Sequence, residues 1–289
     1  MSYYSRLKKA FQNAPVLPLN ANSRYIIFSD CHRGYGTSND NFLKNQHLYF
    51  SALKYYYQQG FTYIELGDGD ELWENRNINR IVEIYNNIFQ LLSLFYREER
   101  LYFIYGNHDI EKKHRSYGSQ ILSTYYCMDS QCQESLFPGL TFYESVILEN
   151  SYDCQRFYLT HGHQASLLNS TLWPLARFLV RYLWKPAEHL GIPDPTSAAQ
   201  NHKQKERTEQ KLTRFATGEN TPLICGHTHR PMLNAESPYY TNCGSCVHPG
   251  CITGIEITGN RLSLIKWVVD TQKDRSLYVA REVLSAVNY

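Results

Sequence analysis

Five short apolar runs recur along the chain, and each ends in a small residue followed by a polar one. They are YIIFSDCH (25–32), YIELGD (63–68), LYFIYGNHD (101–109), FYLTHGH (157–163) and PLICGHTH (222–229). Runs of this length that are rich in Ile, Phe and Tyr and are stopped by Gly or Ser are typical of buried strands. We therefore expect five strands whose carboxyl ends carry Asp, Asn or His.

Helical periodicity separates the first three runs. Residues 41–60 place apolar side chains near helical spacing and end at Gly60, and residues 78–100 carry a longer apolar stripe. Strand–helix–strand alternation predicts a largely parallel sheet with helices outside it. Ligands of such sheets bind beyond the carboxyl ends of the strands. The five runs therefore predict one shared site.

The pattern changes in the second half of the chain. After Arg230 the residues alternate and include Gly259-Asn260, which predicts antiparallel strands joined by a hairpin. Residues 164–221 contain no comparable strand run and read as a helical insertion. Two interpretations of the insertion stay open: a helix that packs on its own domain, or a lid over an amphiphilic or nucleotide-like substrate. Its alternating apolar and basic residues are Leu172, Trp173, Phe178, Leu179, Leu183 and Trp184 with Arg177, Arg181 and Lys185.

Composition narrows the class of protein. Hydrophobic residues make up 43% of the 289 residues and charged residues 19%, which is enough to bury a core. The formal net charge of +2, without a clear basic stripe, argues against nucleic-acid binding. The sequence shows neither a signal-peptide pattern nor an apolar run of membrane-spanning length. We therefore expect a cytoplasmic protein whose eight cysteines are reduced.

The polar residues at the strand ends are potential metal ligands. Three oxygen donors and four imidazoles suit Mn, Fe or Zn better than the all-oxygen sites of Ca or Mg. Seven ligands are too many for one tetrahedral ion but suit two ions that share a carboxylate. The set is Asp30, His32, Asp68, Asn107, His161, His227 and His229.

Together these motifs resemble the ordered motif set of the calcineurin-like metallophosphoesterases. The resemblance runs from about residue 25 to residue 230 and comprises Asp30-x-His32, Gly67-Asp68-x-x-Glu71, Gly106-Asn107-His108-Asp109, His161-Gly162-His163 and Gly226-His227-Thr228-His229. It implies an α/β fold, a four-layer α/β-β/α sandwich. It further implies a single domain over residues 1–289 with a helical cap inserted at 164–221.

The resemblance also implies the metal ligands and the catalytic residues. One metal would be held by Asp30, His32 and His229, the other by Asn107, His161 and His227, with Asp68 bridging them. Mn is the expected ion, ahead of Fe or Zn, and water or hydroxide shared by the metals is the expected nucleophile. His108 would face the substrate phosphate, and Asp109 would orient its imidazole.

The acidic run at residues 63–75 separates into different roles under this resemblance. Asp68 is the expected ligand, and Glu71 matches the second acid of the motif, in a supporting role. Glu65 lies within the strand. Asp70 and Glu74 are expected to be exposed to solvent.

A narrower resemblance concerns Gly67-Asp68-x-x-Glu71-x-Trp73 and the insertion, which are similar to features of UDP-2,3-diacylglucosamine pyrophosphohydrolases. In that group the insertion caps the site and holds acyl chains. Two positions differ, because this chain has His108 where those enzymes have Arg, and His163 where they have Asp. The substrate therefore does not follow from the resemblance.

We expect a binuclear metal-dependent hydrolase of small-molecule phosphodiesters or pyrophosphates, including nucleotide- or lipid-linked ones. The expected partners are a small phosphorylated substrate and an amphiphilic molecule or membrane surface that contacts the cap. A phosphomonoesterase, including a protein Ser/Thr phosphatase, is the main alternative. A nuclease and a scaffold without turnover are remoter ones.

Overall fold

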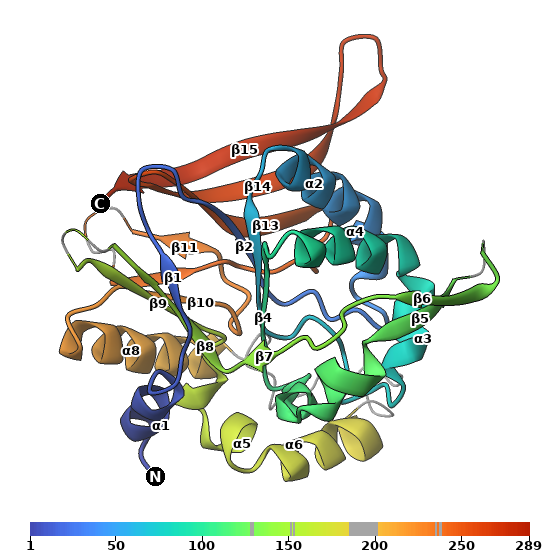
Figure 1. Cartoon of the computed structure of the whole chain (residues 1–289). Coiled ribbons are helices and arrows are strands. Elements are labelled where there is room, and N and C mark those ends of the chain that lie inside the picture. The colour runs from blue at the N-terminus through green and yellow to red at the C-terminus, as the bar shows by residue number, and fades with distance from the viewer. Residues whose placement is uncertain (128–129, 151, 153, 185–201, 235, 237–238) are drawn as a thin grey trace.

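The computed structural model describes residues 1–289 except 128–129, 151, 153, 185–201, 235 and 237–238. Two sheets lie at its centre (Figure 1). The larger has seven strands in the order β15 (Leu277–Asn288), β14 (Arg261–Thr271), β13 (Cys251–Thr258), β2 (Arg24–Phe28), β3 (Thr62–Leu66), β4 (Leu101–Ile104) and β7 (Phe142–Tyr143). The smaller has six in the order β1 (Val16–Pro18), β8 (Ser145–Glu149), β9 (Arg156–Thr160), β10 (Leu223–Cys225), β12 (Tyr240–Asn242) and β11 (Met232–Leu233).

All five predicted strands are present, but they are divided between the two sheets. β2, β3 and β4 pair in parallel in the larger sheet, as the strand–helix alternation predicts. β9 and β10 pair in parallel in the smaller sheet. The predicted hairpin at Gly259-Asn260 is also present and joins β13 to β14. One site at the strand ends therefore draws on both sheets.

Helices and short helical turns make up most of the remaining regular structure among the described residues. They are α1 (Tyr3–Ala10), α2 (Gln46–Gln58), α3 (Ile78–Ile84), α4 (Asn86–Arg97), α5 (Leu167–Ser170), α6 (Trp173–Leu179) and α8 (His202–Gly218), with the short turns η1 (Leu43–Asn45), η2 (Ile110–Lys113), η3 (Tyr117–Ile121), η4 (His163–Ala165) and η5 (Val180–Trp184). The predicted helix over 78–100 is two helices, because the chain leaves helical geometry at Tyr85. α1 begins after Ser2, whose hydroxyl accepts a hydrogen bond from the Ser5 N–H.

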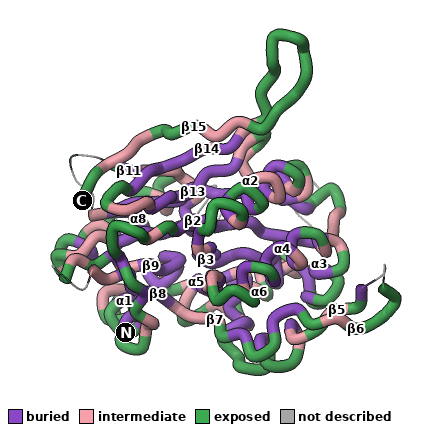
Figure 2. Tube along the Cα trace, turned by 45° about the horizontal axis from the view of Figure 1, so that its top comes forward, coloured by how far each residue is buried: buried purple, intermediate pink, exposed green. Residues whose placement is uncertain are grey.

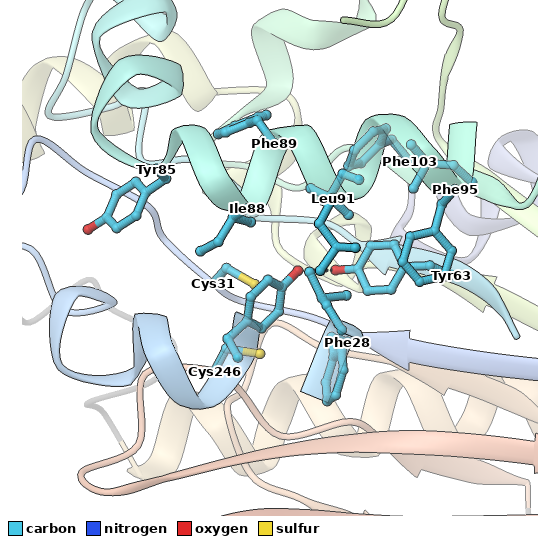
Figure 3. Packing of buried hydrophobic residues seen from close by; sticks show 14 of the residues in the cluster. Phe28, Cys31, Tyr63, Tyr85, Ile88, Phe89, Leu91, Phe95, Phe103 and Cys246 are labelled. Atoms are coloured by element: carbon cyan, nitrogen blue, oxygen red, sulfur yellow. Dashed lines mark hydrogen bonds between the residues drawn. The ribbon is translucent and has the colours of Figure 1, made fainter. Parts of the chain in front are cut away.

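Three apolar layers separate four layers of secondary structure. The first lies between α2, α3, α4 and the larger sheet, and Figure 3 shows Ile88 and Phe95 of α4 facing Phe28 and Tyr63 of that sheet. The second lies between the two sheets, and the third lies between the smaller sheet and α1 and α8. This arrangement confirms the predicted α/β sandwich.

The predicted insertion at 164–221 behaves as two parts. Leu212, Phe215 and Ala216 of α8 pack against Leu223 and Cys225 of the smaller sheet, so α8 belongs to the outer layer of the sandwich. In the preceding part, Ala176 and Val180 pack against Trp73. Residues 185–201 lie outside the described residues, so the extent of a cap stays a prediction.

A second hairpin and the end of β14–β15 extend beyond the sandwich. β5 (Thr124–Cys127) and β6 (Cys132–Ser135) pair with each other in a separate two-stranded sheet. The tip that joins β14 to β15 is exposed and projects away from the end of the molecule that carries α5 and α6 (Figures 1 and 2).

Candidate metal centre

The predicted ligands meet at the carboxyl ends of five strands from the two sheets. β2 leads to Asp30 and His32, β3 to Asp68, β4 to Asn107, β9 to His161, and β10 to His227 and His229. Six of these residues form two groups whose ligand atoms lie within 4.8 Å of one another, Asp30–His32–His229 and Asp68–His161–His227.

In the first group a carboxylate faces two imidazoles. Oδ1 of Asp30 lies 3.0 Å from Nε2 of His229 and 3.8 Å from Nε2 of His32. The two Nε2 atoms are 3.3 Å apart. Three potential ligand atoms therefore surround one point, as they would around a cation.

The second group meets the first at Asp68. Oδ2 of Asp68 lies 3.1 Å from Nε2 of His161 and 3.8 Å from Nε2 of His32, which belongs to the other group. The ring of His227 lies 5.1 Å from that of His161, centroid to centroid. A carboxylate oxygen between two ligand groups is the arrangement that a bridging ligand requires.

Hydrogen bonding leaves the ligand atoms of this centre unused. Nδ1 of His161 donates to the backbone oxygen of Leu66 at 2.9 Å, so Nε2 is the ring nitrogen that can face a metal. That Nε2, Oδ1 of Asp30 and Oδ1 of Asn107 are buried and make no hydrogen bond of suitable geometry among the described residues, although Oδ2 of Asp68 lies 3.1 Å from the first and Nε2 of His229 lies 3.0 Å from the second. Buried polar atoms without partners are rare because they lose their hydration. Divalent cations would satisfy all three, so the donor set fits the metals that the motifs imply.

The electrostatics of the centre favour positive charge. Burial opposes the ionisation of Asp30, yet His229 and His161 hold its pKa well below the usual range. Burial also opposes the ionisation of Asp68, but His161 lowers its pKa as well. Against the effect of burial, Asp68 and Asp30 raise the pKa of His161 to about 9. Burial lowers the pKa of His227 to about 3, so that ring is neutral and able to coordinate.

The backbone at the ligands is strained. Left-handed φ angles occur at Asp30 (54°), His32 (49°), Asp68 (51°), His227 (67°) and His229 (54°). Side chains with a Cβ rarely adopt this region, although Asp, Asn and His do so more readily than most. Strain of this kind persists where the surrounding structure enforces it, and it often marks functional sites.

Two glycines of the motifs make close contacts with ligands. A Cβ at Gly106 would lie 2.1 Å from Oδ1 of Asp68. One at Gly226 would lie 1.9 Å from Oγ of Ser29 and 2.5 Å from Oδ2 of Asp30. The small residue that follows each of these strands therefore leaves the space in which a ligand sits.

A buried ion network lies beneath the centre, and the sequence analysis missed it. Arg33 is fully buried and pairs with both oxygens of Glu65 at 2.8 Å and with Asp70 at 2.7 Å. Nζ of Lys112 lies 2.6 Å from Asp70 and 2.7 Å from Asp109. The prediction that Asp70 is exposed was wrong, because Asp70 is buried, with only 1% of its surface exposed. The only sequence signal was two basic residues close to the motifs.

Asp109 has different partners from those that the resemblance implies. Its oxygens accept hydrogen bonds from the N–H groups of Gly106 at 2.7 Å and Gly69 at 3.1 Å, and from Lys112. It thus ties together the turns after β3 and β4. The expected pairing of Asp109 with the ring of His108 is replaced in the structure by a contact with Glu71.

Glu71 bridges two histidines of the site. Its carboxylate lies 2.8 Å from Nδ1 of His108 and 2.8 Å from Nδ1 of His32. The ring of Trp73 stacks on His108 with the centroids 4.3 Å apart and the planes at 25°. The N–H of His108 donates to Oδ1 of Asp68 at 2.8 Å. His108 is therefore fixed beside the predicted bridging ligand.

The segment over α5, α6 and η5 contacts this site. Nε of Arg181 donates to the backbone oxygen of Trp73 at 2.7 Å, and its guanidinium also donates to that of Leu72 at 2.9 Å. Nδ2 of Asn169 lies 3.4 Å from Nε2 of His227. No motif in the sequence points to Asn169, because its position depends on how the insertion folds back.

Comparison with known proteins shows the family to which this chain belongs. The family model described as calcineurin-like phosphoesterase matches residues 23–231, more than half of the chain. A search of the curated proteins finds no match. Similar solved structures include Vacuolar Protein Sorting 29 from Cryptosporidium parvum, with 15% identity, a TM-score of 0.37 and coverage of 92% of this chain and 100% of that chain.

Vps29 from Chaetomium thermophilum is similar at 11% identity, with a TM-score of 0.43 and coverage of 92% of this chain and 97% of that chain. These two likenesses are too weak to bear on activity. The family match and the fold together confirm the resemblance of the motifs at the level of the superfamily. The chain belongs to the calcineurin-like phosphoesterase family.

Proposed function

We propose that the protein is a binuclear metal-dependent hydrolase of small-molecule phosphodiesters or pyrophosphates, including nucleotide- or lipid-linked ones. One observation carries the proposal. Six of the seven predicted ligands form two neighbouring groups, and Asp30, Asn107 and His161 present buried atoms that make no hydrogen bond of suitable geometry among the described residues. Such a centre suits a substrate whose reacting group is anionic.

The ligand set would hold two divalent ions, of which Mn is the first choice and Fe or Zn the others. One group is Asp30, His32 and His229, the other is Asn107, His161 and His227, and Asp68 lies between them. When bound, such ions supply Lewis acidity and activate water near neutral pH. The carboxylates are suited to this because they remain ionised despite burial.

His108 is the group that would serve the leaving oxygen. Its side chain is 24% exposed, whereas the ligands around it are more deeply buried. Glu71 holds Nδ1, so Nε2 is the ring nitrogen available to a substrate. Proton donation by a positioned imidazole contributes about 10²–10⁴-fold to the rate of such reactions.

The surface of α5, α6 and η5 supports an amphiphilic substrate. Several apolar side chains of this surface are about half exposed. Other apolar residues of the same segment are buried against Trp73. Exposed apolar surface near an active site is typical of a binding surface. Among the described residues no helix has the length and apolarity needed to cross a membrane. The exposed side chains are Leu167 (52%), Leu172 (43%), Leu175 (51%), Phe178 (58%), Tyr182 (54%) and Leu183 (50%).

Hydrolysis of model substrates tests the proposal. The protein is stripped with a chelator, reloaded with Mn²⁺ and assayed on bis-p-nitrophenyl phosphate and p-nitrophenyl phosphate. We expect metal-dependent turnover with preference for the diester. A preference for the monoester would favour a phosphomonoesterase instead. Absence of both turnover and retained metal would reject the hydrolase and leave a scaffold.

A further inference from the structure

One turn after β10 carries an imidazole for each of the two ligand groups. His227 belongs to one group and His229 to the other. Both residues have left-handed φ angles, of 67° and 54°, which side chains with a Cβ rarely adopt. The surrounding structure must therefore hold the turn in shape. Whatever holds it bears on both ligand groups at once.

Thr228 lies between the two histidines and contacts α8 instead of the ligand groups. Its hydroxyl donates to Oε1 of Glu209 at 3.0 Å and lies 3.1 Å from Nδ2 of Asn242, which donates to it. The guanidinium of Arg230, the residue after His229, pairs with Oε2 of the same carboxylate. Each oxygen of Glu209 is thus bonded to the turn that carries the imidazoles.

Glu209 lies on the buried face of α8 and is 5% exposed. The apolar residues that follow it on that face, beginning with Leu212, pack against the smaller sheet. Burial of a carboxylate costs free energy unless hydrogen-bond donors compensate for the lost hydration. Among the described residues its side-chain donors are Thr228 and Arg230. The buried charge is therefore matched to the turn that carries the ligands.

We propose that Glu209 is a positioning residue of the metal centre. It holds Thr228 and Arg230 and thereby fixes the imidazoles of His227 and His229, one for each ion. The inference rests on the proposed function, since it takes the two ligand groups to hold divalent ions. α8 then sets the affinity of the centre for metal, although it supplies none of the predicted ligands.

Titration of the metal-free protein with Mn²⁺ tests the proposal, with the free ion followed by its electron paramagnetic resonance signal. Loss of a group that orients a metal ligand typically weakens metal binding about 10- to 100-fold. We expect Glu209→Ala to raise the Kd for Mn²⁺ by about this factor at both sites. The kcat for bis-p-nitrophenyl phosphate at saturating Mn²⁺ should fall by a smaller factor, because Glu209 contacts neither ions nor substrate.

Glu256 provides a matched control. It is also buried, at 8% exposure, and its carboxylate accepts a hydrogen bond from the hydroxyl of Tyr56 at 3.0 Å and pairs with Arg281 at 2.7 Å. Neither partner is a predicted ligand or adjoins one in the sequence. We expect Glu256→Ala to lower the thermal midpoint of the metal-free protein, as Glu209→Ala does, but to leave the Kd for Mn²⁺ unchanged.

Three further variants connect the effect to one hydrogen bond. Thr228→Val keeps the size of the side chain but removes the hydroxyl, so it should also weaken Mn²⁺ binding. The double variant with Glu209→Ala should bind Mn²⁺ no more weakly than Glu209→Ala alone, because both changes break the same contact. Glu209→Gln keeps an oxygen that can accept from Thr228 and should recover part of the affinity. If Glu209→Ala does not fold, Thr228→Val and Glu209→Gln take its place.

The opposite results overturn the proposal. An unchanged Kd in folded Glu209→Ala would leave Glu209 with a structural role alone. An equal rise of the Kd in Glu209→Ala and Glu256→Ala would make lost stability the cause. Wild-type protein that binds no Mn²⁺ would remove the metal centre and this inference with it. Wild-type protein that binds two Mn²⁺ ions but hydrolyses no phosphoester would remove the proposed hydrolase and leave the role of Glu209 standing.

Discussion

Asp68 lies between the two ligand groups, with one oxygen 3.1 Å from His161 and 3.8 Å from His32. Asp68→Asn keeps the shape of the side chain but removes its charge. We expect kcat/KM for bis-p-nitrophenyl phosphate to fall on the order of 10²–10³-fold, together with the metal content. Metal analysis and kinetics on the same preparation check this. Full activity with two metals bound would exclude a bridging role.

Gly106 tests whether the site tolerates a single added carbon. Because a Cβ there would lie 2.1 Å from Oδ1 of Asp68, Gly106→Ala should displace that carboxylate and reduce metal content and turnover. Gly139→Ala is the control, since Gly139 has no heavy atom within 4 Å of its Cβ position. Gly139 has a positive φ and Gly106 does not, so any backbone strain caused by Ala falls on the control and not on the test variant. Equal losses in the two variants would contradict the steric explanation.

At the scale of single residues, the sequence predicts which residues are candidate ligands better than it predicts which groups each residue contacts. Asp and His after a strand end are visible in one dimension, and the structure brings six of them together. The exposure of Asp70 could not be judged in the same way. Its burial depends on Arg33 and Lys112, which come from other segments and neutralise it in three dimensions.

Among the elements, the turns after β2, β3 and β4 are joined by the ion network of Arg33, Glu65, Asp70, Lys112 and Asp109. Arg33→Met would leave the carboxylates of Glu65 and Asp70 buried with less compensation. We expect the free energy of unfolding to fall by about 3–5 kcal/mol, as measured by urea denaturation.

Lys266→Met provides the comparison for that measurement. Lys266 pairs with Glu282 on the surface at 2.9 Å, and their side chains are 30% and 45% exposed. Exposed pairs contribute little because water screens them. The urea midpoint should therefore stay where it is in wild type. A similar shift of the urea midpoint in both variants would show that burial does not determine how much stability is lost when an ion pair is broken.

The sequence predicts which segments are strands and which are helices, but it does not predict which sheet each strand joins. Apolar runs identify the strands because side chains buried on both faces leave no alternation. Which sheet each run joins is set by pairing between distant segments, and so β9 and β10 could not be separated from β2, β3 and β4 in advance. The break at Tyr85 has the same origin, since its hydroxyl donates to the buried Asp40, 45 residues earlier.

For the molecule as a whole, metals that bind only the folded state should stabilise it. Each site contributes about 2.7 kcal/mol when the free ion is at 100 times its Kd. Chelator treatment should therefore lower the thermal midpoint, and Mn²⁺ should restore it. The same treatment of Asp68→Asn should have a smaller effect. A midpoint indifferent to chelator in wild type would argue against metals in the fold.

The exposed hairpin tip should be dispensable for catalysis. Val269 and Val279 pair across β14 and β15, so a two-residue Asn-Gly turn can replace residues 270–278. The tip projects away from the end of the molecule that carries α5 and α6 (Figure 1). We expect kcat/KM to change by no more than about twofold. A large loss of activity would place part of the substrate or a second chain on the hairpin.

The left-handed backbone at five of the ligands restricts which residues the chain can accept there. Coordination chemistry selects one set of side chains, and local geometry selects another; Asp and His satisfy both. If variants at position 68 were selected for folding alone, without regard to turnover, Asn and Gly should be recovered most often and Val and Ile least. A descendant of this protein that had lost its activity would then still keep Asp, Asn, His or Gly at these positions, because the backbone geometry alone favours them.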